Sequence, residues 1–250
     1  MANFGSGLRS IPPVTRNIII ICVLVWLMGF IAPRFGNTLT NVLGLHYLTA
    51  DNFNPVQIFT YMFLHDFHSI LHVGFNMFTL WMFGRLMEQV WGSKRFFLFY
   101  FVCGIGAALI QEGVWVLTYM HDYVSGIAQL NGLTYESMLE QVNLHPGYFQ
   151  DAIEAYKSQM VTIGASGAIF GLLLGFAFMF PDMPLYLFFI PVPIKAKYMV
   201  IGYAVLEFFL GMNGMQVSVA HFAHLGGMLF GLILLLYWKH KGTLRGGRFY

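Results

Sequence analysis

Six apolar stretches, each close to the length that crosses a bilayer, constrain this chain more than any other feature. A hydrocarbon core of about 30 Å needs about 20 mostly apolar helical residues. Charged residues make up only 10% of the 250 residues, whereas a soluble domain carries about 25%. The sequence therefore predicts an all-α integral membrane protein with six transmembrane helices, and excludes soluble, disordered and nucleic-acid-binding chains. The stretches are residues 17–33, 70–91, 96–120, 161–180, 185–210 and 217–238.

The distribution of basic residues predicts the orientation of these spans. If the N-terminus is cytoplasmic, only Arg34 and Lys157 of the 13 Lys and Arg residues fall on the outer side. Short cytoplasmic loops carry an excess of Lys and Arg, so both termini are expected in the cytoplasm. The basic residues assigned to the cytoplasmic side are Arg9, Arg16, Arg85, Lys94, Arg95, Lys195, Lys197, Lys239, Lys241, Arg245 and Arg248.

The spans divide the chain into a membrane domain with two short flanks. Residues 1–16 are expected to form a cytoplasmic N-terminal segment, residues 17–238 the six-span domain, and residues 239–250 a basic cytoplasmic tail. The layout is compact and shows no additional targeting sequence. We therefore expect the protein in a bacterial inner membrane.

Residues 121–160 are expected to lie outside the membrane on the outer side. They contain two weak helical patterns, near 135–143 and 147–160, and Pro146 suits the first turn of the second helix. The segment carries no motif for a known chemistry. It is interpreted as a small insertion within the membrane domain and not as a second domain.

Polar side chains within spans are costly and therefore mark functional candidates. His72 and Asn76 lie four residues apart, on one face of the second span. Ser166 lies near the start of the fourth span, and His221 and His224 lie near the start of the sixth. All three spans begin on the outer side. At 1.5 Å per residue these side chains are expected at a common depth, about 5–12 Å below the outer surface.

Glycines at four-residue spacing allow these spans to approach one another. Small residues at this spacing permit close backbone contact between membrane helices. Packing of the two glycine faces is expected to bring Ser166 within reach of an imidazole of the sixth span. The glycines are Gly167, Gly171 and Gly175 in the fourth span, and Gly227 and Gly231 in the sixth.

A serine beside an imidazole predicts nucleophilic acyl transfer, because the hydroxyl attacks well only when a base removes its proton. His224 is the expected base, since it lies one turn deeper than His221. His72 and Asn76 are expected to donate hydrogen bonds to the oxyanion, together with the Ser166 backbone N–H. No carboxylate lies at the right depth in these three spans, so the prediction is a Ser–His dyad without an acidic third member.

Each of these features also has a plainer explanation. A serine in a glycine-rich span often only packs, a membrane histidine near the interface often only satisfies a hydrogen bond, and Asn76 by itself could join helices. None of these explanations predicts that all the groups share one depth on alternate spans.

Three segments resemble the rhomboid family of intramembrane serine proteases. They are FLHDFHSILHVGFN (Phe63–Asn76), GASGAIFG (Gly164–Gly171) and AHFAHLGGMLFG (Ala220–Gly231). The resemblance implies a six-helix rhomboid-like bundle that hydrolyses peptide bonds in or near transmembrane segments of membrane proteins. It implies no cofactor and no metal, and partners limited to transmembrane protein substrates and membrane lipids.

The resemblance also implies a role for individual residues. Ser166 becomes the nucleophile, His224 the general base, and His72 and Asn76 the side chains of the oxyanion hole. Gly164 and Gly167 shape the backbone around the serine, and His221 belongs to the same motif as His224. Phe170 stands where many family members have Tyr, so it can stack on the catalytic imidazole but cannot donate a hydrogen bond.

Two other functions stay open at this point. A catalytically inactive rhomboid-like protein would bind transmembrane helices without cutting them, although such relatives typically lack the Ser or the His that are both present here. A small transporter or channel is disfavoured because the chain shows no inverted repeat and few intramembrane acids. Those acids are Glu112 and Glu207, and neither has an assigned role.

The segment Gly211–Gln216, between the fifth and sixth spans, is uncharged and contains two glycines and two methionines. Glycine supplies conformational freedom and methionine adaptable packing. We expect this segment to act as a mobile cap over Ser166.

Overall fold

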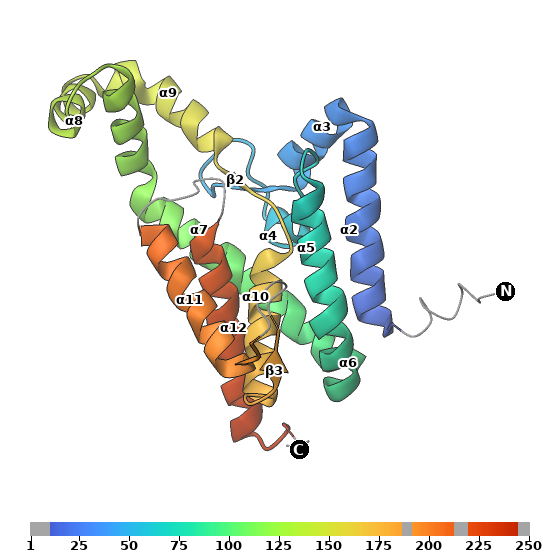
Figure 1. Cartoon of the computed structure of the whole chain (residues 1–250). Coiled ribbons are helices and arrows are strands. Elements are labelled where there is room, and N and C mark those ends of the chain that lie inside the picture. The colour runs from blue at the N-terminus through green and yellow to red at the C-terminus, as the bar shows by residue number, and fades with distance from the viewer. Residues whose placement is uncertain (1–10, 187–191, 213–219, 245–250) are drawn as a thin grey trace.

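The computed structural model of the protein describes residues 11–186, 192–212 and 220–244. Helices make up most of this part, and the four strands have two residues each (Figure 1). The helices are α2 (Pro13–Ile31), α3 (Pro33–Leu43), α4 (Gln57–Thr60), α5 (Ile70–Thr79), α6 (Arg85–Trp91), α7 (Ser93–Leu130), α8 (Tyr135–Leu144), α9 (Pro146–Gln159), α10 (Ser166–Met179), α11 (Ala196–Met212) and α12 (His221–His240), with a 3₁₀ turn η1 (Tyr61–Phe63) and a π turn η2 (Leu80–Gly84).

Within the described residues, α2, α7 and α12 are each long and apolar enough to cross a membrane, and α10 is a shorter apolar helix. Large apolar side chains also cover the outside of the bundle. Leu24 on α2 is 54% exposed, Phe75 on α5 is 58% exposed and Ile201 on α11 is 60% exposed. Apolar exposure on this scale is expected of a surface that faces lipid and not water. The predicted all-α membrane protein is therefore confirmed.

The bundle has two distinct ends (Figure 1). At the upper end in that view, α5, α10 and α12 begin, and α8 and α9 project beyond it. At the lower end, α2 begins, α6 turns into α7, and α12 finishes near the C-terminus. The three motifs of the sequence therefore lie together at the upper end.

The fifth predicted span, residues 185–210, is wrong in its first part. β3 (Pro184–Leu185) pairs antiparallel with β4 (Ile194–Lys195), and the helix α11 begins only at Ala196. The sequence places prolines at 184, 191 and 193. Proline lacks the N–H that a helix interior needs, so this apolar stretch cannot be helical throughout.

The fourth predicted span, residues 161–180, also begins later than expected. β2 (Val161–Thr162) pairs antiparallel with β1 (Leu45–His46) at the upper end, and α10 starts at Ser166. Between them Gly164 has φ of +125°, a conformation outside the right-handed helical region and suited to glycine. The serine therefore opens its helix directly after a loop.

The third span is longer than the predicted 96–120, because α7 has 38 residues and ends at Leu130. At 1.5 Å per residue its length is about 57 Å, well beyond a hydrocarbon core of about 30 Å. Its upper part packs against α8 and α9 through an apolar cluster that includes Val124, Met138 and Val142. The two helices predicted within 121–160 are confirmed.

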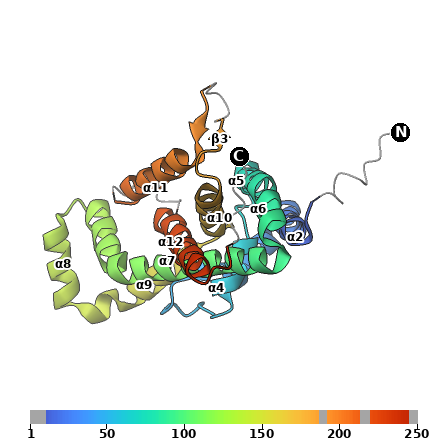
Figure 2. The same ribbon diagram turned by 90° about the horizontal axis from the view of Figure 1, so that it is seen from below.

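Helix α10 lies at the centre of the bundle, where it packs against both α12 and α7 (Figure 2). Glycines form the contact with α12, as the sequence predicted. A side chain at Gly171 would lie 2.7 Å from the carbonyl oxygen of Gly227, and one at Gly227 would collide with the carbonyl group of Gly167. The two backbones therefore touch directly, which only glycine permits.

The lower ends of α6, α7 and α12 pack through aromatic rings instead. The ring of Trp91 lies 4.7 Å from that of Phe99 and 5.7 Å from that of Trp238, between centroids. All three side chains are buried. Large rings fill the wider space between these helices.

Glu88 on α6 is a buried carboxylate at the lower end, and no role was predicted for it. It accepts hydrogen bonds from the backbone N–H groups of Val14 and Thr15, at 3.0 and 2.7 Å. The hydroxyls of Thr15 and Ser93 donate to it as well, each at 2.7 Å. Glu88 thus satisfies N–H groups that the first turn of α2 leaves without helical partners.

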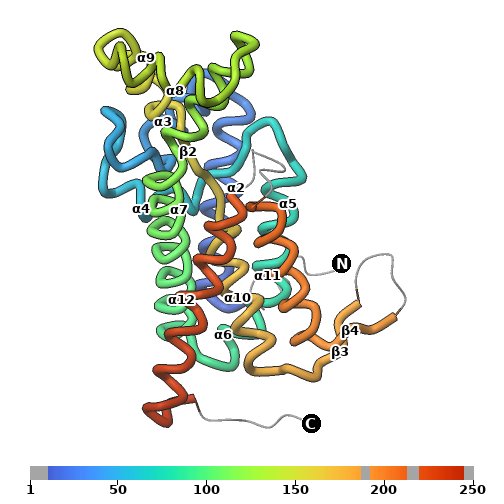
Figure 3. The backbone as a smooth tube through the Cα atoms, turned by 90° about the vertical axis from the view of Figure 1, so that its left-hand side faces the viewer, coloured from blue at the N-terminus to red at the C-terminus, as the bar shows by residue number. Residues whose placement is uncertain are grey.

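Helix α11 is the least enclosed of the helices that flank α10 (Figures 2 and 3). Of its 17 residues, only Ala196 and Val200 are buried, and both lie near its lower end. Its upper part borders α12 and reaches the level of the serine.

Candidate active site

Ser166 and His224 meet at the upper end of the bundle. Ser166 is the first residue of α10, and His224 lies in the first turn of α12. The Oγ atom of Ser166 lies 2.7 Å from Nε2 of His224. A hydroxyl that is hydrogen-bonded to an imidazole is the arrangement of an activated nucleophile. The predicted approach of these two side chains is therefore present in the structure.

Phe170 fixes the plane of the His224 ring. The two rings stack with centroids 4.2 Å apart and planes inclined by only 4°. Phe170 follows Ser166 by four residues on α10, so both side chains lie on one face of that helix. The stacking expected from the sequence is confirmed.

His72, on α5, has a defined tautomer. Its Nδ1 atom accepts a hydrogen bond from the backbone N–H of Asp66 at 3.2 Å. A ring nitrogen that accepts cannot carry the proton, so the proton of the neutral ring lies on Nε2. The Nε2 atom is therefore a hydrogen-bond donor.

Gly164 lies between this donor and the serine. A methyl group on Gly164 would lie 3.1 Å from Nε2 of His72 and 3.8 Å from Oγ of Ser166. The missing side chain therefore leaves room between the two groups for a reacting atom. The backbone N–H of Gly164 donates to the carbonyl oxygen of Tyr61 at 3.0 Å, which ties the loop to the core.

Asn76 is less closely connected to the serine. Its Nδ2 atom donates to the carbonyl oxygen of His72, one turn earlier on the same helix, at 2.8 Å. This bond commits one of the two amide hydrogens. No described contact joins Asn76 to Ser166, so its role in the oxyanion hole stays a prediction.

A carboxylate without a predicted role lies beside the two histidines. Glu207 comes from α11, and its Oε2 atom is 2.6 Å from Nδ1 of His221 and 3.0 Å from Nδ1 of His224. The expected dyad without an acidic neighbour is thus corrected. The expectation considered only the second, fourth and sixth spans, whereas the carboxylate comes from the fifth.

Depth along the helices would have revealed this neighbour. Glu207 precedes the end of α11 at Met212 by five residues, which corresponds to about 7.5 Å of helix. His221 and His224 lie in the first turn of α12, which runs in the opposite direction. The acid and the imidazoles therefore lie at nearly the same level.

Comparison with known proteins agrees with these motifs. The family model of the Rhomboid domain matches residues 52–241, which include all three motifs. The chain belongs to the rhomboid family. It is 26% identical over 169 residues to Rhomboid protein 1, mitochondrial, of Saccharomyces cerevisiae, a match that covers 65% of this chain and 36% of the yeast protein. The matched part is thus about a third of the length of that curated relative.

Among the described residues of this rhomboid, one group could offer three ligands to a metal ion. It consists of Glu207, His221 and His224. Their ligand atoms lie within 4.8 Å of one another. Two ligands bound to tetrahedral zinc at 2.0–2.1 Å are about 3.3 Å apart, whereas Glu207 and His221 are separated by 2.6 Å. Glu207 and His221 would have to move apart to bind one ion, so their present geometry is that of groups bonded to each other.

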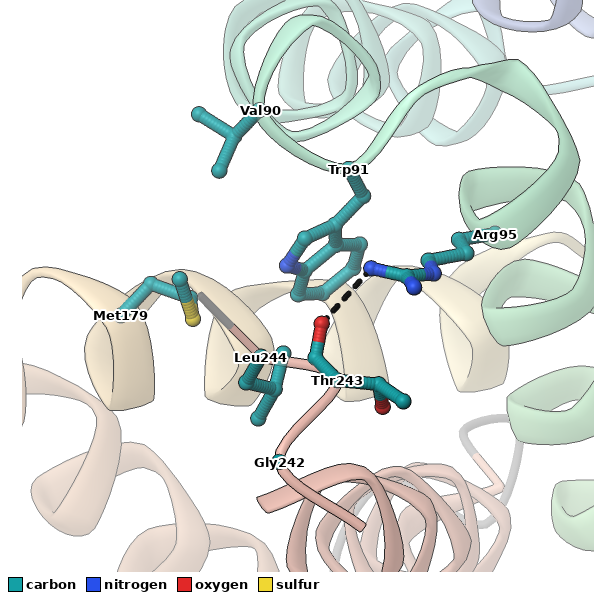
Figure 4. Close-up of a pocket in the computed structure, with 7 residues that line it drawn as sticks. All are labelled: Val90, Trp91, Arg95, Met179, Gly242, Thr243 and Leu244. Carbon is teal, nitrogen blue, oxygen red and sulfur yellow. Dashed lines mark hydrogen bonds between the residues drawn. The ribbon is translucent and has the colours of Figure 1, made fainter. Parts of the chain in front are cut away.

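A cavity of about 420 Å³ lies at the lower end of the bundle and is separate from Ser166 (Figure 4). Arg95 crosses it and donates to the carbonyl oxygen of Thr243 at 2.8 Å. None of the predicted site residues lines it. The lining residues are Val90, Trp91, Arg95, Met179, Gly242, Thr243 and Leu244.

The predicted cap of this rhomboid falls mostly on residues that the structure does not describe. Gly211 and Met212 form the end of α11, and residues 213–216 lie outside the described ranges. The cap over Ser166 therefore stays a prediction.

Proposed function

We propose that this member of the rhomboid family is an intramembrane serine endopeptidase. Its substrates are membrane proteins that it cuts in or near their transmembrane segments. The observation that carries the proposal is the 2.7 Å contact between Oγ of Ser166 and Nε2 of His224. Family membership supports the same class of function.

In this mechanism His224 acts as the general base. As Oγ of Ser166 attacks the scissile carbonyl carbon, Nε2 of His224 takes the hydroxyl proton. The same nitrogen then donates that proton to the leaving amine, which releases one product and leaves an acyl ester on Ser166. Water, deprotonated by His224, hydrolyses the ester and restores the serine.

The negative charge that develops on the carbonyl oxygen needs donors placed in advance. The Nε2–H group of His72 is the donor best supported, because the bond from Asp66 fixes its tautomer. The backbone N–H of Ser166, at the start of α10, is a second candidate. The remaining amide hydrogen of Asn76 is a third.

The upper end of the bundle faces away from the cytoplasm in this proposal. The ends of α2, α7 and α12 that carry basic residues lie at the lower end (Figure 1), and such residues favour the cytoplasmic side. Residues 1–16 and 239–250 are then cytoplasmic, and α8 and α9 lie outside. A bacterial inner membrane is the proposed location.

Labelling with a fluorescent fluorophosphonate tests the proposal without knowledge of the substrate. Wild-type protein in detergent should be labelled. The labelling rates of Ser166→Ala and His224→Ala should be below about 1% of the wild-type rate, because loss of either group removes several orders of magnitude of reactivity. Ser125→Ala, on the upper part of α7, is the matched serine control and should keep the wild-type rate.

Three results would contradict the assignment. A folded wild-type protein that is not labelled, beside a known rhomboid that is, would favour a helix-binding protein without protease activity. Labelling that survives Ser166→Ala would identify another serine as the nucleophile. Labelling that survives His224→Ala would assign the base elsewhere. Thermal unfolding of each variant in the same detergent shows whether it is folded.

A further inference from the structure

We propose that Glu207 is a positioning residue for His224, so that the serine and the histidine work with a carboxylate as a third member. The carboxylate holds the proton of the neutral imidazole on Nδ1 and leaves Nε2 free to accept the proton of Ser166. This inference rests on the proposed function and deepens it.

Geometry is the first support. The Oε2 atom of Glu207 lies 3.0 Å from Nδ1 of His224, on the side of the ring away from Ser166. The side chains of Glu207 and His224 are 12% and 9% exposed. Coulombic attraction between them is therefore weakened less by water than at an exposed site.

The second support is that Nδ1 of His224 is buried and makes no well-directed hydrogen bond with any described residue. The contact with Glu207 satisfies the distance for an ion pair but not the direction of a hydrogen bond. Catalytic hydrogen bonds are often poorly aligned before substrate binds and tighten in the complex. The separation of 3.0 Å between Oε2 of Glu207 and Nδ1 of His224 is already that of such a bond.

Proton placement explains what the carboxylate contributes. An ionised carboxylate only accepts hydrogen bonds, so it favours the tautomer with the proton on Nδ1. In the other tautomer Nε2 carries the proton, and this nitrogen could then not act as a base toward Ser166. During attack the proton of Ser166 moves to Nε2, the Nδ1 proton stays in place, and Glu207 remains ionised beside the new imidazolium.

His221 completes the arrangement from the other side. Its Nδ1 atom lies 2.6 Å from the same Oε2 atom, so one carboxylate oxygen joins two imidazoles of α12. This contact also attaches the upper part of α11 to α12. In a purely structural role Glu207 would only attach α11 to α12 and would not affect the tautomer of His224. Labelling rates and the tautomer of His224 distinguish this role from positioning.

The first test compares labelling rates of Glu207→Gln, Glu207→Asp and wild type. Replacing the acid that orients the histidine of a serine-protease triad by its amide costs up to about 10⁴-fold in rate, so Glu207→Gln should be labelled at least about tenfold more slowly. Glu207→Asp should recover part of the rate because it keeps the charge. Glu112→Gln is the matched control, since Glu112 is a buried glutamate on another helix and accepts from Leu48 N–H at 2.9 Å. Its labelling rate should stay within about twofold of wild type.

The second test reads the tautomer directly and does not depend on activity. Nitrogen-15 NMR of the histidines in a Ser166→Ala background, with His224→Asn to assign the signal, should show the proton of neutral His224 on Nδ1. In Glu207→Gln the signal should move toward the other tautomer. This measurement stays informative if wild-type protein is not labelled, so failure of the proposed function and failure of this inference can be told apart.

Three outcomes would overturn the role of Glu207. One is a wild-type labelling rate in folded Glu207→Gln. Another is a proton of neutral His224 on Nε2 while Glu207 is intact, a result that needs no variant of Glu207 to fold. The third is that Glu207→Gln has no further effect on the rate in a His221→Asn background, which would mean that Glu207 acts only through His221.

Discussion

The two ends of the bundle hold their helices together by different means. At the upper end α10 and α12 touch through Gly167, Gly171 and Gly227, so the backbones themselves set the distance. At the lower end, the rings of Trp91 and Trp238 fill the space between helices. Backbone contact leaves little freedom in position, and this rigid contact lies where two side chains must meet within hydrogen-bond distance.

Each end also has a glutamate inside the bundle, Glu88 at the lower end and Glu207 at the upper end, and the two differ in their partners. Glu88 accepts from backbone N–H groups and hydroxyls, none of which changes charge near neutral pH. Glu207 faces two imidazoles, which can take up and release protons. The comparison teaches that burial of an acid does not by itself identify a functional site, whereas the chemistry of its partners does. Stability and reactivity should therefore respond separately to changes at the two ends.

The largest predicted effect is on stability and comes from the lower end. Glu88→Ala should lower the free energy of unfolding by about 3 kcal/mol or more, because several buried donors lose an ionised acceptor. The thermal midpoint in detergent should fall by about 6–12 °C. The labelling rate per folded molecule should stay at the wild-type value.

Glu88→Gln is the control, since its amide oxygen still accepts and its loss of stability should be smaller. If Glu88→Ala lowered the labelling rate while the protein stayed fully folded, the lower end would affect reactivity as well as stability, which contradicts this prediction.

An intermediate effect is predicted for the glycine contact at the upper end. Gly227→Ala forces α12 away from the carbonyl group of Gly167, and overpacking of this kind costs about 2 kcal/mol. Because a displacement of about 1 Å can cost about 100-fold in rate, labelling should fall at least tenfold.

Gly202→Ala on α11 makes the same chemical change where a new methyl group meets no atom within 4 Å. Its stability should be unchanged or slightly higher, as alanine favours helix. Equal thermal midpoints and labelling rates for the two alanine variants would contradict the importance of the backbone contact.

The smallest predicted effect concerns the ring beneath the base. Phe170→Leu removes the stacking on His224, and an aromatic contact of this kind is worth about 1 kcal/mol. The labelling rate should therefore fall about fivefold with little change in thermal midpoint. Phe170→Tyr keeps the ring and should stay near the wild-type rate. A Leu variant as reactive as wild type would show that Phe170 only fills space.

The sequence predicted most of the upper end because its signals are local. Polar residues near the starts of alternate spans share a depth, and glycine spacing indicates which faces meet. Together these signals predicted that Ser166 and His224 meet. The stacking of Phe170 on the imidazole was implied by the resemblance to the rhomboid family, many members of which have Tyr at this position.

Features that depend on contacts distant in sequence were missed. Glu88 contacts residues more than 70 positions away, and the pairing of Glu207 with His224 depends on how α11 lies against α12. Hydropathy alone also failed at residues 184–195, because an apolar strand and an apolar helix look the same by composition. Pro184 and Pro193 were the signal that this apolar stretch is not one helix.

The direct contact of Gly167 with Gly227 has a consequence for how this chain can change in length. Ser166 immediately precedes one glycine, and His224 lies three residues before the other. One residue inserted or deleted between His224 and Gly227 would turn the histidine by about 100° around its helix and away from the serine, since a helix has 3.6 residues per turn. Loops elsewhere can gain or lose residues, whereas these two short intervals are fixed in register.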